Sequence, residues 1–200
     1  MRLSSWVWCW MMRWRTHMQA LSSRLASAVF ALRSIRRNID SVTSLNAYFA
    51  YFHSIISYAI LFWGFTAGTG DILILQKKAV RAVFGLTQRT SCRPYFKNNN
   101  ILTLYAQLTL DSCLAIHKLS GTLMKHENVH RHNTRNKSNI VKSNRLGFSF
   151  LNGGVNLYNL LPTSHKELNQ ERLREALKSK LAEAVPYSLD ECISALRTLC

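Results

Sequence analysis

Hydrophobic side chains recur at helical spacing along much of the chain. From Gln19 to Ile39 they fall within one narrow sector of a helical wheel, and Arg24, Arg33 and Arg37 project away from that sector. This segment is therefore predicted to form an amphipathic helix with a cationic outer side. The hydrophobic sector comprises Leu21, Leu25, Ala28, Val29, Leu32, Ile35 and Ile39.

The most apolar segment runs from Leu45 to Thr66 and is long enough to suggest a membrane span. Polar side chains are spread along it, however, and such groups are costly in lipid. We therefore expect a buried core helix, with a membrane-spanning helix as the alternative. The polar residues are Asn46, His53, Ser54 and Ser57.

Helices are also predicted on both sides of a loop in the middle of the chain. Ile72 to Phe84 has the pattern of a second amphipathic helix, and Gly85 is a stop signal for it. The asparagine run that ends at Asn100 indicates that Gln88 to Asn100 is a loop. Ile101 to Leu119 is apolar nearly all round, which is typical of a buried helix.

A second loop is predicted later in the chain. Lys125 to Asn144 is polar, basic and aperiodic, so we expect it to be long and exposed. Leu146, Phe148 and Phe150 then alternate with polar or small residues as in a short strand. The run Asn152-Gly153-Gly154 that follows indicates a turn.

Two capping boxes indicate where the last helices begin. Ser164-x-x-Glu167 is predicted to open a helix with a leucine stripe, and Ser188-x-x-Glu191 to open a final short helix. The stripe comprises Leu173, Leu177 and Leu181. The whole pattern predicts a mainly α fold, an irregular helical bundle with long basic loops and at most one short β-hairpin.

The formal net charge of +16, with a sequence pI of about 10.2, points to a class of partner. Such an imbalance destabilises a compact chain unless a polyanion offsets it, so nucleic acid is the leading partner and anionic membrane the second. No acid occurs between Asp71 and Asp111, or between Glu127 and Glu167. A solvated surface is the alternative role for the cations there. The candidate nucleic-acid-binding residues are Lys77, Lys78, Arg81, Arg89, Arg93, Lys97, Arg131, Arg135 and Lys137.

Aromatic rings and hydrogen-bonding side chains accompany these cations. Tyr95 and Phe96 either stack on bases or anchor their loop to the core, and the sequence favours neither role. The arginines and asparagines between Arg131 and Asn139 suit a loop that orders on RNA or DNA. Both features fit a surface that follows a nucleic-acid backbone.

The five cysteines are scattered and include no C-x-x-C pair. They suit reduced thiols in a nuclear or cytoplasmic protein. The tryptophan-rich start, followed at once by Arg13 and Arg15, lacks a small-residue cleavage site, so we expect a protein that is not secreted. Cys92 lies between Arg89 and Arg93, where a lowered thiol pKa is conceivable, but an ordinary loop cysteine is the preferred interpretation.

Catalytic and metal-binding patterns are weak throughout the sequence. Its four aspartates are unpaired, so no two-metal nucleotidyl-transfer site is predicted. His126, His130 and His132 lie close together, but they lack the paired cysteines or histidines of a structural zinc site. No nucleophile turn or phosphate-binding glycine loop is recognisable. We expect no metal, no cofactor and no small-molecule substrate.

Several short phrases occur in a consistent order along the chain. Trp14-Arg15-Thr16-His17 precedes the first helix, and His53 to Gly64 ends in a tryptophan–glycine pair. Later phrases are Leu75 to Gly85, Thr90 to Phe96, Ile101 to Leu104, His132-Asn133-Thr134-Arg135, and Leu157-Tyr158-Asn159-Leu160-Leu161-Pro162. In this order they resemble the region past the catalytic palm of reverse transcriptases from non-LTR retrotransposons, the jockey-like endonuclease–reverse transcriptase elements.

The resemblance implies a thumb and C-terminal extension that grip the template–primer duplex during target-primed reverse transcription. It implies RNA or an RNA–DNA duplex and the upstream palm as partners, but no catalysis, because the aromatic-x-Asp-Asp motif is missing. The expected divisions are a non-matching start at 1–13, a helical thumb-like region at 14–122, a basic flexible loop at 123–145 and a helical extension at 146–200. The alternatives are a membrane-associated protein and an inactive relic of a decayed element.

Overall fold

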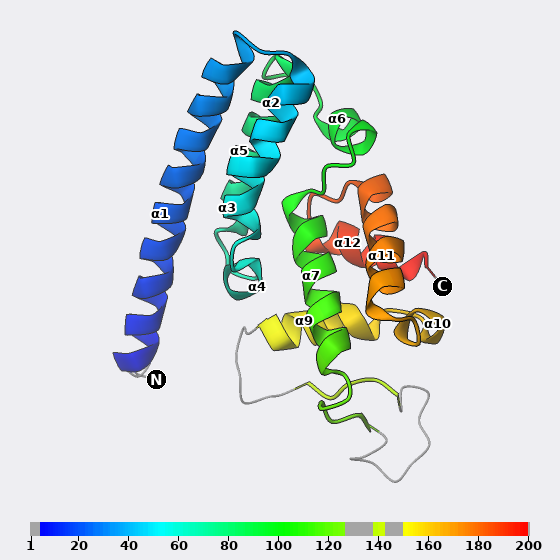
Figure 1. The fold of residues 1–200 in the computed structure, drawn as a ribbon. Coiled ribbons are helices and arrows are strands. Elements are labelled where there is room, and N and C mark those ends of the chain that lie inside the picture. The colour runs from blue at the N-terminus through cyan, green and yellow to red at the C-terminus, as the bar shows by residue number, and fades with distance from the viewer. Residues whose placement is uncertain (1–4, 127–137, 143–149, 200) are drawn as a thin grey trace. The chain divides into compact units, whose positions relative to one another are not determined.

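The computed structural model describes residues 5–126, 138–142 and 150–199, with the backbone alone for residues 5–15 and 150. It is 72% helical and has no strand in these ranges, which confirms the predicted mainly α class (Figure 1). The chain divides into two compact units, Met1–Tyr95 and Phe96–Cys200. This division falls within the stretch 14–122 that the sequence suggested was one helical region.

The first unit, which we call unit 1, contains a long helix, four short segments and a second long helix. These are α1 (Ser5–Arg36), α2 (Ser41–Ala47), the π-helix η1 (Tyr48–His53), α3 (Ser54–Ser57), α4 (Ile60–Trp63) and α5 (Thr69–Phe84). Helix α6 (Arg93–Asn98) follows a loop and includes the boundary between the units. Because α6 begins at Arg93, the prediction that Gln88 to Asn100 is a loop throughout was wrong. Pro94 is compatible with this helix because it lies in the first turn.

Helices α1 and α5 lie side by side and supply much of the core of unit 1 (Figure 1). The predicted sector of α1 is buried from Leu21 to Leu32, which confirms the amphipathic pattern. Ile39 is exposed because α1 ends before it, at Arg36. The predicted stop of α5 is also confirmed, since Gly85 takes the left-handed conformation (φ 65°) and donates its N–H to the Arg81 carbonyl.

The segment from Leu45 to Thr66 does not form the single buried helix that its composition suggested. Its helical path is broken after Ser57, where Tyr58 is extended and Ala59 is left-handed (φ 53°). The Trp63 indole Nε1 donates to the Tyr58 carbonyl at 3.1 Å and so satisfies a backbone group that the break frees. Among the described residues, no helix is both long and apolar enough to cross a membrane.

Burial along this segment is also divided. Tyr48, Phe52 and Trp63 lie in the core, whereas Tyr58 and Phe62 are exposed. Tyr48 accepts a hydrogen bond at 3.0 Å from the buried amide of Gln76 on α5, so the core of unit 1 contains a paired polar contact. Such pairing is required because an unpaired buried amide is costly.

The second unit, unit 2, is built on α7 (Leu104–Leu119). It also contains α9 (Phe150–Asn159), α10 (Thr163–Lys166), α11 (Gln170–Ala184) and α12 (Leu189–Arg197). Helix α7 confirms the predicted buried helix, with Thr103 as its N-cap. The Thr103 hydroxyl also donates to the Pro186 carbonyl at 2.6 Å and thereby ties the start of α7 to the α11–α12 connection.

The predicted strand and glycine turn before residue 155 are not observed where the structure can test them. Leu146 and Phe148 lie outside the described residues, and Phe150 begins α9, which runs through Asn152-Gly153-Gly154. A Cβ atom at Gly154 would lie 3.0 Å from Ile116 Cγ1 and 3.5 Å from the Ser112 Cβ atom, both on α7. This glycine therefore permits close helix packing rather than a turn.

One of the two capping boxes opens the helix that was assigned to it. Ser188 Oγ accepts the Glu191 N–H at 3.2 Å, and Glu191 in turn accepts from the Tyr187 N–H, as expected for α12. The leucine stripe of α11 is fully buried, also as expected. Its N-cap, however, is Asn169 and not Ser164, because α10 ends at Lys166 and a new helix starts at Gln170.

Candidate nucleic-acid interface

The loop after α5 is held against the helix that precedes it. Arg81 Nη2 donates to the Thr90 carbonyl at 3.2 Å, and the Cys92 thiol donates to the Lys77 carbonyl at 3.7 Å. These contacts reach both the middle and the end of the loop, which is thereby fixed on the surface of α5. Little conformational freedom remains there to be lost when a ligand binds.

The cations predicted for this region differ in their surroundings. Lys78 on α5, Arg89 in the loop and Arg93 on α6 are exposed. We call these three residues the α5–α6 cationic surface. Lys97 is also exposed and follows Arg93 by four residues on α6, so both occupy the same side of that helix.

Lys77 and Arg81 are half-buried. Both hold the loop in place, Lys77 through its backbone carbonyl and Arg81 through its side chain. Arg81 donates one guanidinium N–H to the Thr90 carbonyl, and its Nε atom is buried without a hydrogen-bond partner. Its main role is thus to position the loop. The remaining candidates, Arg131, Arg135 and Lys137, lie outside the described residues.

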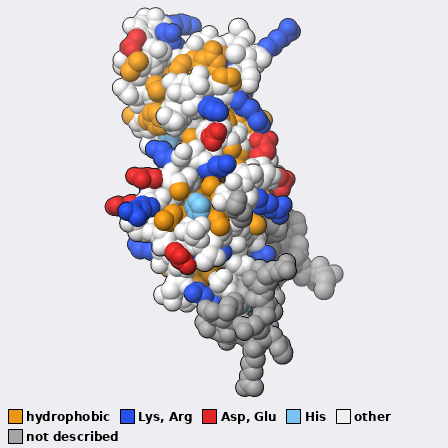
Figure 2. Space-filling view, turned by 90° about the vertical axis from the view of Figure 1, so that its right-hand side faces the viewer, with side chains coloured by type: hydrophobic (Ala, Val, Ile, Leu, Met, Phe, Trp, Pro, Cys, Tyr) orange, Lys and Arg blue, Asp and Glu red, His pale blue; other side chains and the backbone are white. Residues whose placement is uncertain are grey.

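Electrostatics distinguish the two units. Residues 1–95 contain twelve Lys and Arg residues and only two acids, Asp40 and Asp71. Asp40 caps α2 by accepting the Val42 and Thr43 N–H groups, and hydrogen bonding to Thr43 lowers its carboxyl pKa. On the face that Figure 2 shows, Lys and Arg side chains project at several points, and Asp and Glu side chains lie among them. Unit 1 therefore carries most of the uncompensated positive charge.

Tyr95 and Phe96, whose role the sequence left open, both pack against other rings. The Tyr95 ring centroid lies 5.2 Å from that of Phe84 at the end of α5. Phe96 is fully buried, and its ring lies edge-on to Tyr187 at 6.1 Å. These contacts favour anchoring of α6 over stacking on bases.

The ends of the second basic loop pair with each other in unit 2. Lys125 and Ile140 form an isolated antiparallel bridge, and the His126 N–H donates to the Asn139 carbonyl at 3.0 Å. Asn159 on α9 donates to the Ile140 carbonyl at 2.9 Å and accepts its N–H at 3.0 Å. Lys166 Nζ adds bonds to the Asn139 side chain and the Asn159 carbonyl.

These bonds give the Leu157-to-Pro162 phrase a structural role. Leu157, Tyr158 and Leu161 are buried, and Asn159 uses its whole amide to hold Ile140. Tyr158 also shares a 3.1 Å hydrogen bond with His117 Nδ1 on α7. The phrase therefore holds Ile140, which pairs with Lys125 across the His132-to-Lys137 run; that run lies outside the described residues.

Among the cysteines whose side chains are described, Cys92, Cys113 and Cys192 form no disulfide bond and are buried. Burial raises the pKa of Cys113 and Cys192 to about 12, which suits inert thiols in the core. Burial also raises the pKa of Cys92, although Arg81 and Lys77 oppose the shift. The lowered pKa conceived for Cys92 is thus wrong, and a structural thiol in the loop is the better description.

Catalytic groups do not converge in the part of the chain that can be described. No three of its His, Cys, Asp and Glu residues lie close enough together to hold a metal ion. Of the three clustered histidines, His126 is described and His130 and His132 are not. The arrangement offers charge and hydrogen bonding, but no constellation for bond cleavage.

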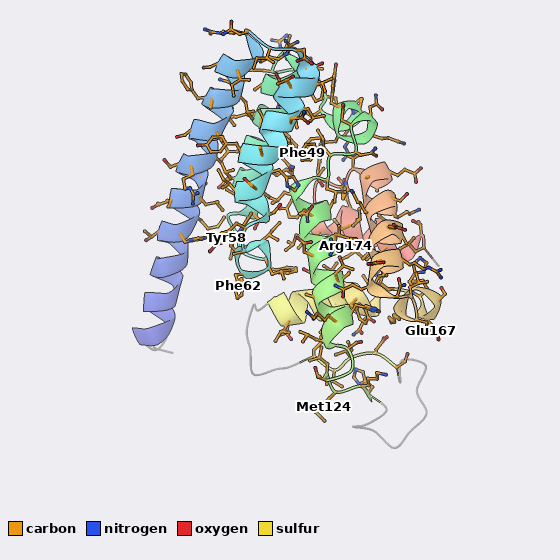
Figure 3. All side chains as sticks on the ribbon, in the orientation of Figure 1. Phe49, Tyr58, Phe62, Met124, Glu167 and Arg174 are labelled. Carbon is orange, nitrogen blue, oxygen red and sulfur yellow. The ribbon has the colours of Figure 1, made fainter. Side chains whose placement is uncertain are left out.

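Sequence reasoning missed the exposed aromatic side chains of unit 1. Phe30 on α1 is 73% exposed, and Tyr58 and Phe62 project from the broken α3–α4 segment (Figure 3). The position of Phe30 was a detectable signal, because it lies nine residues after Leu21 and hence about half a turn around the helix from the buried sector. The exposure of Tyr58 depends on the break at Ala59, for which the sequence has no glycine or proline signal.

Comparison with protein-family models, curated proteins and solved structures finds no match to this chain.

Proposed function

We propose that the chain is a nucleic-acid-gripping part of a non-LTR retrotransposon reverse transcriptase, located past the catalytic palm and without a catalytic centre of its own. Its ligand is RNA or an RNA–DNA duplex, bound through the phosphate backbone. The upstream palm of the parent polyprotein supplies the polymerase chemistry. Two independent lines support this proposal: the order of the sequence phrases and the cationic surface.

The α5–α6 cationic surface carries the proposal. Lys78, Arg89 and Arg93 are exposed, and the loop between them is fixed by the Arg81 and Cys92 contacts described above. No acid occurs between Asp71 and Asp111, so no carboxylate of this segment competes with phosphate. Exposed cations whose backbone is already held in place bind a polyanion with less loss of conformational entropy than cations of a free loop.

The resemblance supports the identity of the polyanion. Phrases from Trp14 to Pro162 follow the order of the retrotransposon family, in which this region grips the template–primer duplex. The Leu75-to-Gly85 and Thr90-to-Phe96 phrases coincide with α5, its C-cap and the start of α6. Two of the phrases that carry the resemblance thus contain Lys78 and Arg93 of the cationic surface, and Arg89 lies between them.

Binding of the full chain to an RNA–DNA duplex across a salt series tests the proposal. We expect the logarithm of the association constant to fall linearly with the logarithm of the salt concentration, by about 0.7 to 0.9 in slope for each phosphate neutralised. The triple variant Lys78→Gln, Arg89→Gln, Arg93→Gln is expected to reduce the slope by about 2 to 3.

A second triple variant controls for net charge. Arg172, Lys178 and Arg197 are equally exposed cations of α11 and α12, where acids are interspersed with them. Their replacement by glutamine removes the same charge. It should change the salt slope by less than about 0.9, the contribution of one phosphate contact. A flat salt response of the unchanged chain, or equal losses in the two triple variants, would contradict the proposal.

A further inference from the structure

Helix α1 has an outer side on which one aromatic ring stands among small side chains. Its partners in unit 1 are α5, α2 and η1, and all three lie on the same side of α1 (Figure 1). Phe30 points away from them and is 73% exposed. A fully buried phenylalanine side chain contributes about 1.5 to 3 kcal/mol to folding, a gain that Phe30 largely forgoes in this fold.

The small neighbours of Phe30 leave its ring accessible. Ser27 and Ser34 lie three residues before and four residues after it, so they share its side of the helix. Each hydroxyl donates to the carbonyl four residues earlier, at 3.2 Å to Ser23 and 3.3 Å to Phe30, and is thereby held close to the helix backbone. Neither side chain can cover the ring.

Along the chain, arginines follow Phe30 closely and acids do not. Arg33 follows Phe30 by three residues, and Arg37 follows the last residue of the helix; both are exposed. The sequence of α1 contains five arginines and no acid. Asp40, the nearest acid along the chain, has its carboxylate engaged by the Val42 and Thr43 N–H groups.

We propose that Phe30 and Arg33 on this outer side of α1, together with Arg37 just after the helix, bind single-stranded nucleic acid by stacking one base on Phe30 and pairing the adjacent phosphates with the two arginines. An accessible ring beside cations is the combination that binds single strands without regard to sequence. A duplex keeps its base faces stacked inside and cannot use the ring. A second copy of the chain would bring another acid-free, arginine-bearing helix against the first, which like-charge repulsion disfavours.

The inference extends the proposed function from phosphates to bases and rests on it. In that setting the α5–α6 cationic surface holds a duplex, while α1 holds an unpaired strand. The two activities reside on different residues of unit 1. They can therefore be removed separately.

The test compares two labelled single strands of equal length, an oligothymidylate of about a dozen nucleotides and an abasic strand with the same phosphates, by fluorescence anisotropy. The Phe30→Ala variant of the full chain should bind oligothymidylate about 5- to 100-fold more weakly and the abasic strand within about twofold of the unchanged chain. Phe30→Trp should retain binding, because a larger ring still stacks. Arg33→Gln should weaken binding to both strands and reduce the salt slope by about 0.7.

Phe62→Ala is the matched control, since Phe62 is another exposed phenylalanine of unit 1, on α4 rather than on α1 (Figure 3). It should bind both strands like the unchanged chain. Phe30→Ala removes an exposed side chain, and an unchanged thermal melt checks that its effect is not due to unfolding.

Three results would overturn the inference: Phe30→Ala binding oligothymidylate normally, Phe62→Ala losing as much affinity, or Phe30→Ala converting a dimer into a monomer in sedimentation. Failure of the proposed function has a different signature, namely duplex binding that does not depend on salt. Salt-dependent duplex binding together with an unaffected Phe30→Ala variant would contradict only the role of α1.

Discussion

The side-chain amide of Asn159 pairs with both backbone polar groups of Ile140, as a neighbouring β-strand would. Its Oδ1 atom accepts the Ile140 N–H at 3.0 Å, and its Nδ2 atom donates to the Ile140 carbonyl at 2.9 Å. Ile140 is buried, so water cannot easily replace these two bonds. One side chain on α9 thus fixes a residue nineteen positions away in the sequence.

Replacement of Asn159 should therefore be costly. We expect Asn159→Ala to reduce the free energy of unfolding by about 2 to 4 kcal/mol, because two buried backbone groups lose their partners. Asn159→Asp keeps the acceptor but loses the donor, and should fall between the alanine variant and the unchanged protein. Urea denaturation measures both, and a loss below about 0.5 kcal/mol for the alanine variant would show that the pairing contributes little.

Gly154 offers a direct test of helix packing in unit 2. Gly154→Ala adds a Cβ atom 3.0 Å from Ile116 Cγ1, and we expect a net destabilisation of about 1 to 3 kcal/mol despite the better helix propensity of alanine. Gly121→Ala is the control, because no atom lies within 4 Å of the added Cβ there. Thermal melts should therefore show a lower Tm for the first variant only. Equal Tm values would mean that α7 and α9 adjust easily.

The start of α11 can be tested by two alanine variants. Asn169→Ala removes the cap that accepts the Arg172 N–H at 2.8 Å and should cost about 0.5 to 2 kcal/mol. Ser164→Ala alters the residue that the sequence pattern favoured and should cost less than about 0.5 kcal/mol, because Ser164 does not cap this helix. The reverse order of the two effects in urea denaturation would restore the sequence-based assignment.

Arg81 and Lys78 should behave differently although both are cations of α5. Arg81→Gln loses the bond to the Thr90 carbonyl, so we expect faster amide hydrogen exchange across residues 86–92. Lys78→Gln should leave exchange unchanged and weaken nucleic-acid binding, because its side chain is exposed. If exchange in the loop is insensitive to Arg81→Gln, the loop is fixed by its other contacts.

The buried thiols predict a dependence of stability on alkaline pH. Burial raises the pKa of Cys113 and Cys192 to about 12, above the value of about 8.5 in the unfolded chain. Because the unfolded state then releases protons that the folded state retains, stability should fall as pH rises between these two values, by up to about 1.4 kcal/mol per pH unit for each thiol. The variant Cys113→Ala, Cys192→Ala should have a shallower decline between pH of about 9 and 10.5 in urea denaturation. Parallel declines would show that other groups, such as tyrosines, account for it.

Local patterns predicted those elements whose hydrophobic period is long and unbroken. The sector of α1 from Leu21 to Leu32, the apolar α7 and the leucine stripe of α11 are buried as their spacing indicated. The Gly85 stop and the Ser188 cap were also predicted correctly, because each depends on a few neighbouring backbone groups. Patterns confined to one helix were therefore sufficient in these places.

Predictions failed where contacts between distant residues decide the outcome. The Leu45-to-Thr66 segment is broken at Ala59, and Trp63 supports that break by bonding the Tyr58 carbonyl. Gly154 looked like a turn residue, yet it lies inside a helix, where its missing side chain allows the close approach of Ile116 on α7. The candidate site was likewise predictable only in part. The cations were visible in the sequence, but only the fold distinguishes the exposed Lys78, Arg89 and Arg93 from the half-buried Arg81.

The sequence by itself determined the helical class and the net positive charge, and the resemblance to a reverse transcriptase past its palm is a prediction made from it. These properties depend on composition and on short-range periodicity, which the chain carries in any conformation. Tertiary structure alone decided that Asn159 pairs with Ile140, that Arg81 holds the loop after α5, and that the ring of Phe30 remains exposed. Those outcomes depend on which groups exclude water from one another, and that is settled only when distant segments pack together.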